Sequence, residues 1–145
     1  MSQLVIMSFA FSRGEPPDAN LVFDMRFLRN PHWQEPLRPL SGLDEAVGAY
    51  IVGDPAYAEA LARLEALLLN LLPLYQADGK ADVRIALGCT GGRHRSVHVA
   101  EEVARRLRAA GFSPRLDHRD LAAPPRVGTE RSAGDGPEGP GTDGC

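Results

Sequence analysis

The sequence predicts an α/β fold with a mainly parallel or mixed sheet of about four strands flanked by helices. Two stretches near the N-terminus have the length and apolar character of strands, and the first of them is apolar on both alternating faces, as is typical of a strand covered on both sides. Two later stretches carry apolar residues at helical spacing. Between them, a short apolar run at residues 83–87 leads through glycines into the later of these two helices, which starts near Arg93. Strands alternating with helices favour a parallel sheet.

Composition predicts one domain and a tail. A chain of 145 residues with 43% hydrophobic content can form one compact core, which we place at residues 1–121. Residues 122–145 are rich in Gly and Pro, and we expect them to be disordered. The net charge of −3 argues against coating of nucleic acid by bulk positive charge, so an RNA contact would need a local basic patch.

The cysteines and the N-terminus indicate a cytoplasmic protein. Cys89 and Cys145 lie in unlike contexts, which does not suggest a disulfide framework. The N-terminal QLVIMSFAF has no basic leader, so we expect no signal peptide. No run approaches the roughly 20 apolar residues that span a bilayer, so we expect no membrane partner.

The first two strands are expected at Leu4–Phe11 and Asn20–Leu28, separated by a loop with Gly14, Pro16 and Pro17. Asp24 and Arg26 lie side by side late in the second strand. They form either a buried ion pair or part of a site at the end of the strand.

The segment Arg29–Pro39 contains three prolines, the single Trp and a His, and we expect neither helix nor central strand there. Such a loop serves either as packing or as the wall of a pocket.

Two helices should follow. Ser41 or Asp44 can cap a short helix to about Val52, and Asp54-Pro55 can start a longer one. Pro73 should kink or end the longer helix near Leu72. The expected core stripe consists of Tyr57, Leu61, Leu64, Leu68, Leu71, Leu72 and Tyr75.

The central unit is a strand at Val83–Leu87, a loop at Gly88–Gly92 and a helix from about Arg93 to Leu107 that Gly111 terminates. A last strand at Phe112–His118 should lie at a sheet edge because of Pro114. The pairs Glu101/Arg105 and Glu102/Arg106, each four residues apart, should lie on a solvated helix face.

The start of this helix is the candidate site. Helix N-termini carry unpaired N–H groups and a positive dipole end, which hold anions. Cations are disfavoured at this end of a helix, yet the sequence places Arg93, His94 and Arg95 there, followed by Ser96. This arrangement favours a negatively charged ligand. In the first interpretation, Thr90, Gly91 and Gly92 cradle an anion that Arg95 clamps. Ligands bind beyond the carboxyl ends of strands, so residues 26–32 and 89–96 should be walls of one pocket.

A second interpretation is enzymatic. Five residues separate Cys89 from Arg95, and Ser96 follows, which is the spacing found in cysteine-dependent phosphatases. In those enzymes a thiolate attacks phosphorus and the Arg holds the equatorial oxygens. Asp18 and Asp120 are the loop aspartates that could serve as the general acid.

Two further interpretations remain. His94 and His98, four apart on a helix, could bind zinc with Cys89 or His118, although no third ligand has a telling spacing. We therefore expect no metal and no cofactor. Alternatively, the glycines form a tight turn and the basic residues are merely exposed.

The strings MSFAFSRGEPPDANLVFDMRFLRNPHW, LRPLSGLD and IALGCTGGRHRSV resemble the C-terminal domain of the RapZ family of RNase adapter (YvcJ-like) proteins. The similarity runs from about Leu4 to Leu121, and the two motifs FDxRFLxNPHW and GCTGGxHRS are specific in combination. The chain has no GxxxxGK[ST] pattern, so the resemblance does not extend to the family's N-terminal P-loop domain.

The resemblance implies a regulatory adapter without catalysis. Family members bind small regulatory RNAs and an endoribonuclease, and their C-terminal domain senses glucosamine 6-phosphate. The implied fold is similar to the C-terminal subdomain of 6-phosphofructokinase. Whether several copies assemble is left open. By position, the implied pocket for a phosphorylated amino sugar or similar anion consists of Arg26, Asn30, His32, Thr90, Gly91, Gly92, His94, Arg95 and Ser96.

Overall fold

Four parallel strands form the sheet, in the order β2-β3-β1-β4. The computed structural model describes residues 3–122. The strands are β1 (Gln3–Ala10), β2 (Leu21–Asp24), β3 (Asp82–Cys89) and β4 (Arg115–His118). Full-length pairing of β1 with β3 forms the centre, from Gln3 opposite Asp82 to Ala10 opposite Cys89. The expected α/β fold is confirmed, and its sheet is entirely parallel.

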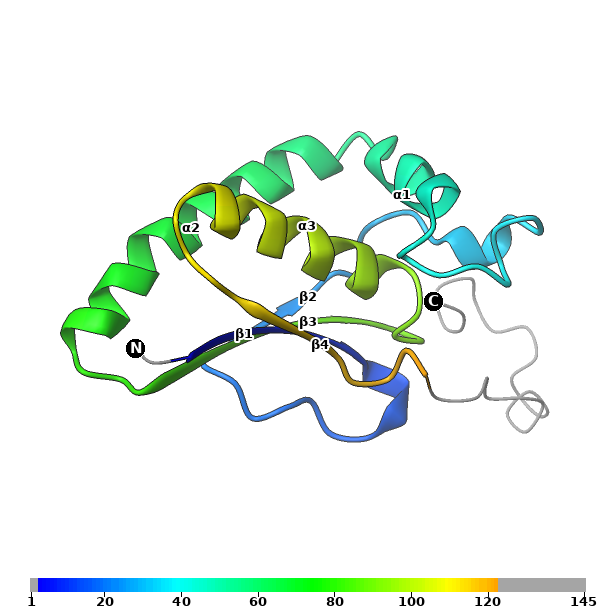
Figure 1. The fold of residues 1–145 in the computed structure, drawn as a ribbon. Coiled ribbons are helices and arrows are strands. Elements are labelled where there is room, and N and C mark those ends of the chain that lie inside the picture. The colour runs from blue at the N-terminus through cyan, green and yellow to red at the C-terminus, as the bar shows by residue number, and fades with distance from the viewer. Residues whose placement is uncertain (1–2, 123–145) are drawn as a thin grey trace.

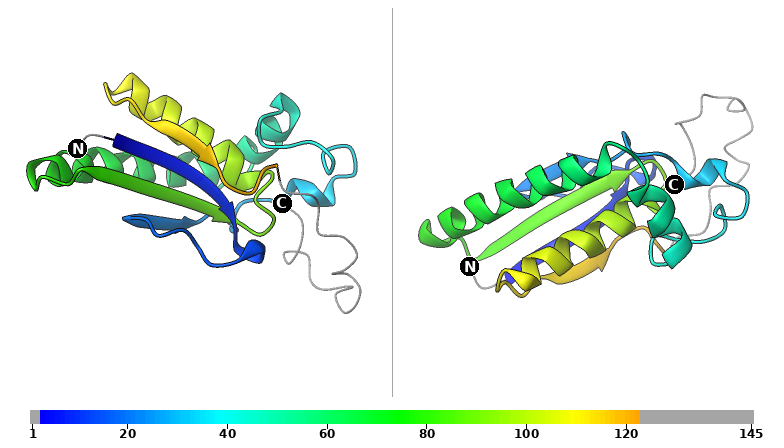
Figure 2. Two further views of the ribbon diagram at one scale, coloured as in Figure 1. Left: turned by 60° about the horizontal axis from the view of Figure 1, so that its bottom comes forward. Right: turned by 90° about the horizontal axis from the view of Figure 1, so that it is seen from above.

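Three α-helices cover one face of this sheet: α1 (Glu45–Val52), α2 (Tyr57–Ala77) and α3 (Arg95–Ala109) (Figure 1). The path of the chain explains why. The connections from β2 to β3 and from β3 to β4 advance in the same direction across the sheet, so right-handed crossovers put their helices on the same face. The connection from β1 back to β2 runs the opposite way and passes across the other face (Figures 1 and 2).

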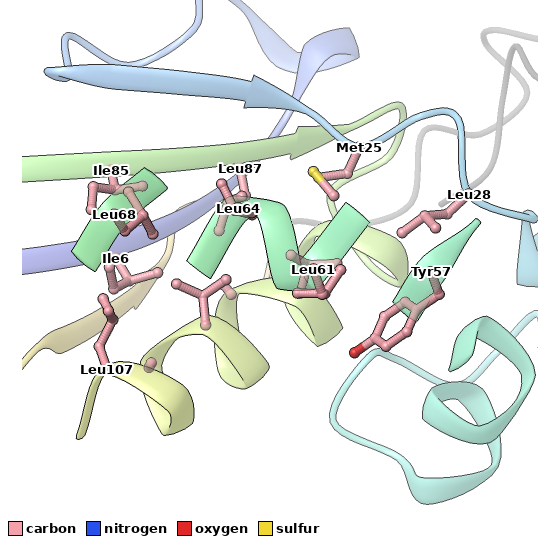
Figure 3. Packing of buried hydrophobic residues seen from close by; sticks show 14 of the residues in the cluster. Ile6, Met25, Leu28, Tyr57, Leu61, Leu64, Leu68, Ile85, Leu87 and Leu107 are labelled. Carbon is pink, nitrogen blue, oxygen red and sulfur yellow. The ribbon is translucent and has the colours of Figure 1, made fainter. Parts of the chain in front are cut away.

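The main core lies between the sheet and the helices. It joins Ile6, Ile85 and Leu87 of the strands to the inner stripe of α2 and to Leu107 of α3 (Figure 3). The buried residues of the α2 stripe are Tyr57, Leu61, Leu64, Leu68 and Leu72, as predicted, whereas Leu71 and Tyr75 are partly buried. None of the described helices has the length and apolar character needed to cross a membrane.

A smaller cluster lies on the opposite face, where β1 contributes Val5, Met7 and Phe9. Phe11 and Ala19, from the β1–β2 connection, pack against it. Both faces of β1 are therefore apolar and buried, as its sequence predicts.

The second strand is shorter than predicted, because β2 ends at Asp24 and does not reach Leu28. The Asp24 carboxylate accepts the backbone N–H of Arg26 at 2.9 Å, a local turn that competes with strand pairing. Met25 and Leu28, three residues apart, are then both buried, while Phe27 is exposed. The alternating pattern predicted for residues 25–28 is therefore wrong.

Two helical expectations are also corrected. Of the two outcomes expected at Pro73, an end of the helix near Leu72 is wrong, because α2 continues to Ala77, and a kink stays a prediction. Pro73 is exposed, so water can reach the backbone there, and the partly buried Tyr75 continues to pack on the core. The prediction of no helix in residues 29–39 fails for a single 3-10 turn, η2 (Pro31–Trp33), in which proline occupies the first helical turn.

Other boundaries differ by a few residues. The longer helix starts at Tyr57 and not at Pro55, although Asp54 accepts the N–H of Ala56 at 2.8 Å. Gly88 and Cys89 belong to β3, and β4 starts at Arg115. The edge position of β4 and the termination of α3 at Gly111, with φ +99°, agree with prediction.

The predicted tail begins at residue 122, and its residues 123–145 lie outside the described part of the chain.

Candidate functional site

The loop between β3 and α3 lies at a switch point of the sheet. The chain leaves β1 toward one face through the 3-10 turn η1 (Phe11–Arg13), and it leaves the neighbouring β3 toward the other face through residues 90–94. Crevices open between such strands in parallel sheets. The Ser12 N–H donates to the Thr90 carbonyl at 3.2 Å, so η1 forms one wall beside the loop.

Gly92 gives the loop its shape. Its φ of +71° favours glycine, and a Cβ at this position would lie 2.8 Å from Cβ of Ala10. Gly92 is buried against the end of β1, whereas Gly91 is partly exposed. Thr90 is nearly buried and borders the same loop. The loop backbone therefore packs so closely on the end of β1 that there is no room for a side chain at residue 92.

Cys89 and Ser96 close the base of the loop. Both are fully buried. The Cys89 sulfur accepts the backbone N–H of Ser96 at 3.2 Å, and its thiol donates to the Ser96 hydroxyl oxygen at 3.1 Å. One of the unpaired N–H groups at the helix start is thus satisfied by a side chain. In this conformation the sulfur is not accessible to an incoming phosphate ester.

Arg95 is directed toward the end of β2. It is 2% exposed, and its Nη1 donates to the carbonyl oxygens of Arg26 at 2.7 Å and Leu28 at 2.9 Å. The two segments predicted as pocket walls are therefore joined by Arg95 itself. At least one nitrogen of the predicted phosphate clamp is engaged by the protein's own backbone.

Arg26 and Asp24 form a two-point ion pair at the end of β2. Arg26 donates from Nε at 2.9 Å and from Nη2 at 2.6 Å to the two carboxylate oxygens. Both side chains are about half exposed, and the guanidinium lies 4.0 Å from the centre of the Phe11 ring. The hydrogen bond from Arg26 lowers the pKa of Asp24, so this carboxylate stays charged beside the loop.

Asn30 and His32 occupy the segment that follows. The Asn30 side chain accepts the N–H of His32 at 3.0 Å and caps η2. His32 is partly exposed, and its ring meets the Trp33 ring edge to face at 4.9 Å. This segment is tied to the helical layer, because Asp54 accepts the Arg29 N–H at 2.7 Å.

His94 is buried beneath this segment and is 1% exposed. Burial, followed by the charge of Arg93 and the proximity of His32, lowers the pKa of His94 to about 4. The carbonyls of Leu37 and Leu40 oppose the shift, although neither ring nitrogen reaches hydrogen-bonding geometry with a described residue. His94 is therefore neutral at pH 7 and contributes no positive charge to the site.

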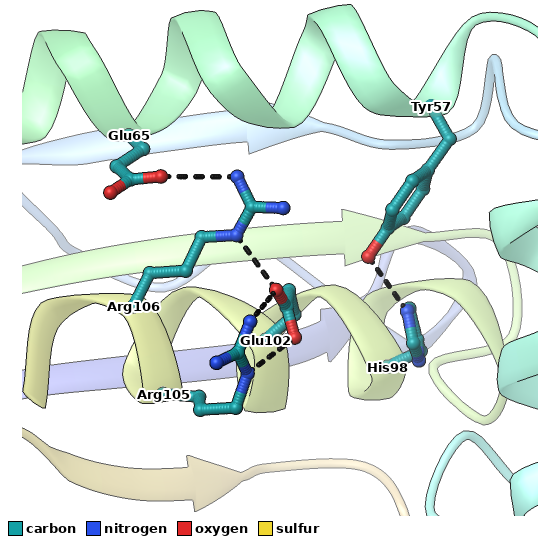
Figure 4. A network of polar contacts seen from close by, with 6 residues as sticks. All are labelled: Tyr57, Glu65, His98, Glu102, Arg105 and Arg106. Carbon is teal, nitrogen blue, oxygen red and sulfur yellow. Dashed lines mark hydrogen bonds and ion pairs between the residues drawn. The ribbon is translucent and has the colours of Figure 1, made fainter. Parts of the chain in front are cut away.

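The histidines His98 and His118, considered as zinc ligands, make other contacts in the structure. His98 Nε2 lies 2.9 Å from the Tyr57 hydroxyl (Figure 4), and His118 bridges Ser8 at 2.7 Å and Glu101 at 2.8 Å. Within residues 3–122, no three His, Cys, Asp or Glu side chains gather as a metal site.

The charge pairs predicted on α3 are partly wrong. Glu102 pairs with Arg106, as predicted, but also with Arg105, and Arg106 reaches Glu65 of α2 (Figure 4). Glu101 contacts His118 instead of Arg105.

The sequence placed Arg93 among the basic residues at the helix start and nominated Asp120 as a possible general acid, but it predicted the contacts of neither. Arg93 donates to carbonyls of residues 39 and 40. Asp120 accepts the Ala10 N–H at 2.7 Å, and its Cβ lies 3.1 Å from where a Gly92 Cβ would be. The basic character of Arg93 is visible in the sequence, but its contacts are not. Nothing in the local pattern links Asp120 to Ala10. The other nominated acid, Asp18, is exposed on the β1–β2 connection.

These features define an α/β domain with a parallel sheet, and the candidate site lies at the carboxyl edge of that sheet. The chain belongs to the RapZ C-terminal domain family, whose model matches residues 2–122.

Curated relatives support this assignment. The chain is 67% identical over 118 residues to a nucleotide-binding protein of Rhizorhabdus wittichii, covering 81% of this chain and 38% of that protein. It is 63% identical over 120 residues to one of Novosphingobium aromaticivorans, covering 83% and 39%, and 47% identical over 116 residues to one of Cutibacterium acnes, covering 80% and 40%. The chain thus spans about two fifths of the length of these relatives.

Proposed function

We propose that this domain senses a phosphorylated amino sugar, such as glucosamine 6-phosphate, in the site described above. The supporting observation is the pair of hydrogen bonds from Arg95 to the carbonyls of Arg26 and Leu28. These bonds join the end of β2 to the start of α3, which supports a site between the glycine loop and the segment that follows β2.

The charges suit such a ligand. The loop amides, Thr90 and the start of α3 can donate hydrogen bonds to phosphate oxygens. Arg26, Asn30 and His32 can bind the rest of the sugar, or a phosphate of RNA. The charged Asp24 supplies a partner for an ammonium group, which a plain sugar phosphate lacks.

The test is calorimetric titration of the protein with glucosamine 6-phosphate, glucose 6-phosphate, glucosamine and inorganic phosphate. We expect the amino-sugar phosphate to bind most tightly and glucosamine without phosphate not to bind. At one hundred times its dissociation constant, a bound ligand should stabilise the fold by about 2.7 kcal/mol. His32→Ala should weaken binding, whereas Gln34→Ala, at the exposed end of η2, should not. Absence of binding by every sugar phosphate would refute the proposal.

We further propose that the site region contacts RNA, as an adapter for a small regulatory RNA and an endoribonuclease. Positive charge beside the site comes from Arg29, Arg38 and Arg93. The sequence after Leu121 adds no net positive charge, because it carries two arginines against four carboxylates. Phosphate contacts make such binding steeply salt-dependent. Binding of a structured RNA that does not weaken between low and high salt would contradict this role.

The second candidate is phosphatase chemistry, which the contacts between Cys89 and Ser96 favour. Hydrolysis of an aryl phosphate by the wild type, lost in Cys89→Ser, would support it. We propose a non-catalytic role instead, because the Cys89 sulfur is buried and Arg95 already binds backbone carbonyls.

A further inference from the structure

Arg93 lies between the glycine loop and α3, but its guanidinium is directed to a different segment. Its Nε donates to the Leu40 carbonyl at 2.8 Å, and its Nη2 donates to the Pro39 carbonyl at 2.6 Å. The Nε/Nη2 edge is the one with which arginine binds carboxylates and phosphates in two-point fashion. In Arg93 this edge is occupied by the protein backbone.

The segment that Arg93 holds also fits closely on the start of α3. The Gly42 N–H donates to the Arg93 carbonyl at 2.8 Å. A Cβ at Gly42 would lie 2.4 Å from the His94 carbonyl oxygen and 2.5 Å from the His98 backbone nitrogen. Residues 39–42 are therefore anchored both by the Arg93 side chain and by direct backbone contact.

This anchor is connected to His32 through a continuous series of turns. Backbone hydrogen bonds join residues 30 to 33, 31 to 34, 34 to 37 and 37 to 40. The Arg38 Nε also donates back to the His32 carbonyl at 2.7 Å. At its other end, the same segment is fixed by Arg95 and Asp54. Displacement of residues 39–42 would therefore move His32.

We propose that Arg93 is a positioning residue of the sugar-phosphate site: it holds residues 30–42, and with them His32, in place, without contacting the phosphate itself. This inference rests on the proposed function. It assigns to Arg93 a role different from that of the loop amides and Thr90, for which we propose direct contact with the phosphate.

The test compares two ligands in one set of variants by calorimetry. Arg93→Ala should weaken binding of glucosamine 6-phosphate by about tenfold, the lower end of the loss seen when supporting partners of ligand-binding groups are removed at metal sites. Binding of inorganic phosphate, which needs the loop and not His32, should be unchanged. Arg93→Lys can donate to one carbonyl and should be intermediate.

Two variants serve as comparisons. Gly42→Ala displaces the same segment without removing a charge, and it should reproduce the selective loss. Arg63→Ala removes an exposed arginine that pairs with Glu59 on α2, and it should bind both ligands as the wild type does.

The outcomes separate the two proposals. Equal weakening of both ligands in Arg93→Ala would show that Arg93 contacts the phosphate and would overturn the inference alone. Unchanged binding of the sugar phosphate in a folded Arg93→Ala protein would also overturn it. Failure of the wild type to bind any sugar phosphate would refute the proposed function and this inference with it.

Discussion

Arg95 Nη1 lies 2.9 Å from the carbonyl oxygen of Leu28, across 67 residues of sequence. The contact joins the first turn of α3 to the segment that follows β2, and the guanidinium is almost completely buried. A buried arginine that donates to backbone carbonyls fixes the relative position of two segments. The geometry of the candidate site therefore depends on Arg95 even before a ligand binds.

Arg95→Ala should destabilise the fold and abolish ligand-dependent stabilisation. The substitution leaves the carbonyls of Arg26 and Leu28 without this donor, and each buried polar group left unsatisfied costs about 1–3 kcal/mol. Urea unfolding measures the loss. The exposed Arg105→Ala is the control and should change stability little. Thermal stabilisation by glucosamine 6-phosphate that persists in a folded Arg95→Ala protein would contradict the assigned site.

Gly92→Ala should destabilise the protein more than Gly14→Ala. Both glycines have positive φ, at +71° and +106°, so each substitution introduces backbone strain of order 1 kcal/mol or more. At Gly92 the new methyl group would also meet Ala10 at 2.8 Å, whereas nothing lies within 4 Å at Gly14. Chemical denaturation compares the two variants. Equal losses would mean that the loop does not fit closely on β1.

Acid should weaken the fold through His94. Its pKa is about 4 in the folded protein and about 6.5 in the unfolded chain. The unfolded chain binds the proton more readily, so stability is fully retained above pH 6.5 and is lost as the pH falls through 4. The loss is of order 3 kcal/mol. The pKa of His98 is also lowered by burial, which adds to the effect.

Unfolding free energies at several pH values between 7.5 and 4 measure this dependence. The paired carboxylate Glu102, with a pKa of about 2, contributes below its unfolded value of 4.5, so the interval from 6.5 to 4.5 reports on the histidines. His94→Gln should flatten the profile in that interval. An unchanged slope would show that folding does not lower the pKa of His94.

Leu68→Ala should lower the free energy of unfolding by about 2–5 kcal/mol, because Leu68 is fully buried on the inner face of α2 and its truncation leaves a cavity. Leu67→Ala, one residue earlier and 41% exposed, should change stability by about 0.5 kcal/mol at most. The pair has the same helical context and the same atoms removed. Similar losses of stability for both variants would mean that α2 packs on the sheet through a different face.

Local sequence patterns predicted most of the architecture. The apolar run of β1, the stripe of α2, the strand-glycine-helix unit and the stop at Gly111 each depend on residues close together in the chain, so short-range chemistry sets them. The same patterns failed at residues 25–28, where the Asp24 side chain bends the backbone of a segment that otherwise reads as a strand.

The contacts within the site were beyond the reach of the sequence. The motif indicated that Arg95 and the glycines belong to an anion site, but nothing local indicates that Arg95 donates to Leu28 or that Arg93 holds Pro39. These contacts arise when β2 and β3 become neighbours in the sheet and α3 packs on them. A guanidinium can bind a ligand or a carbonyl equally well, and the partner is decided by which backbone the folded chain brings within 3 Å.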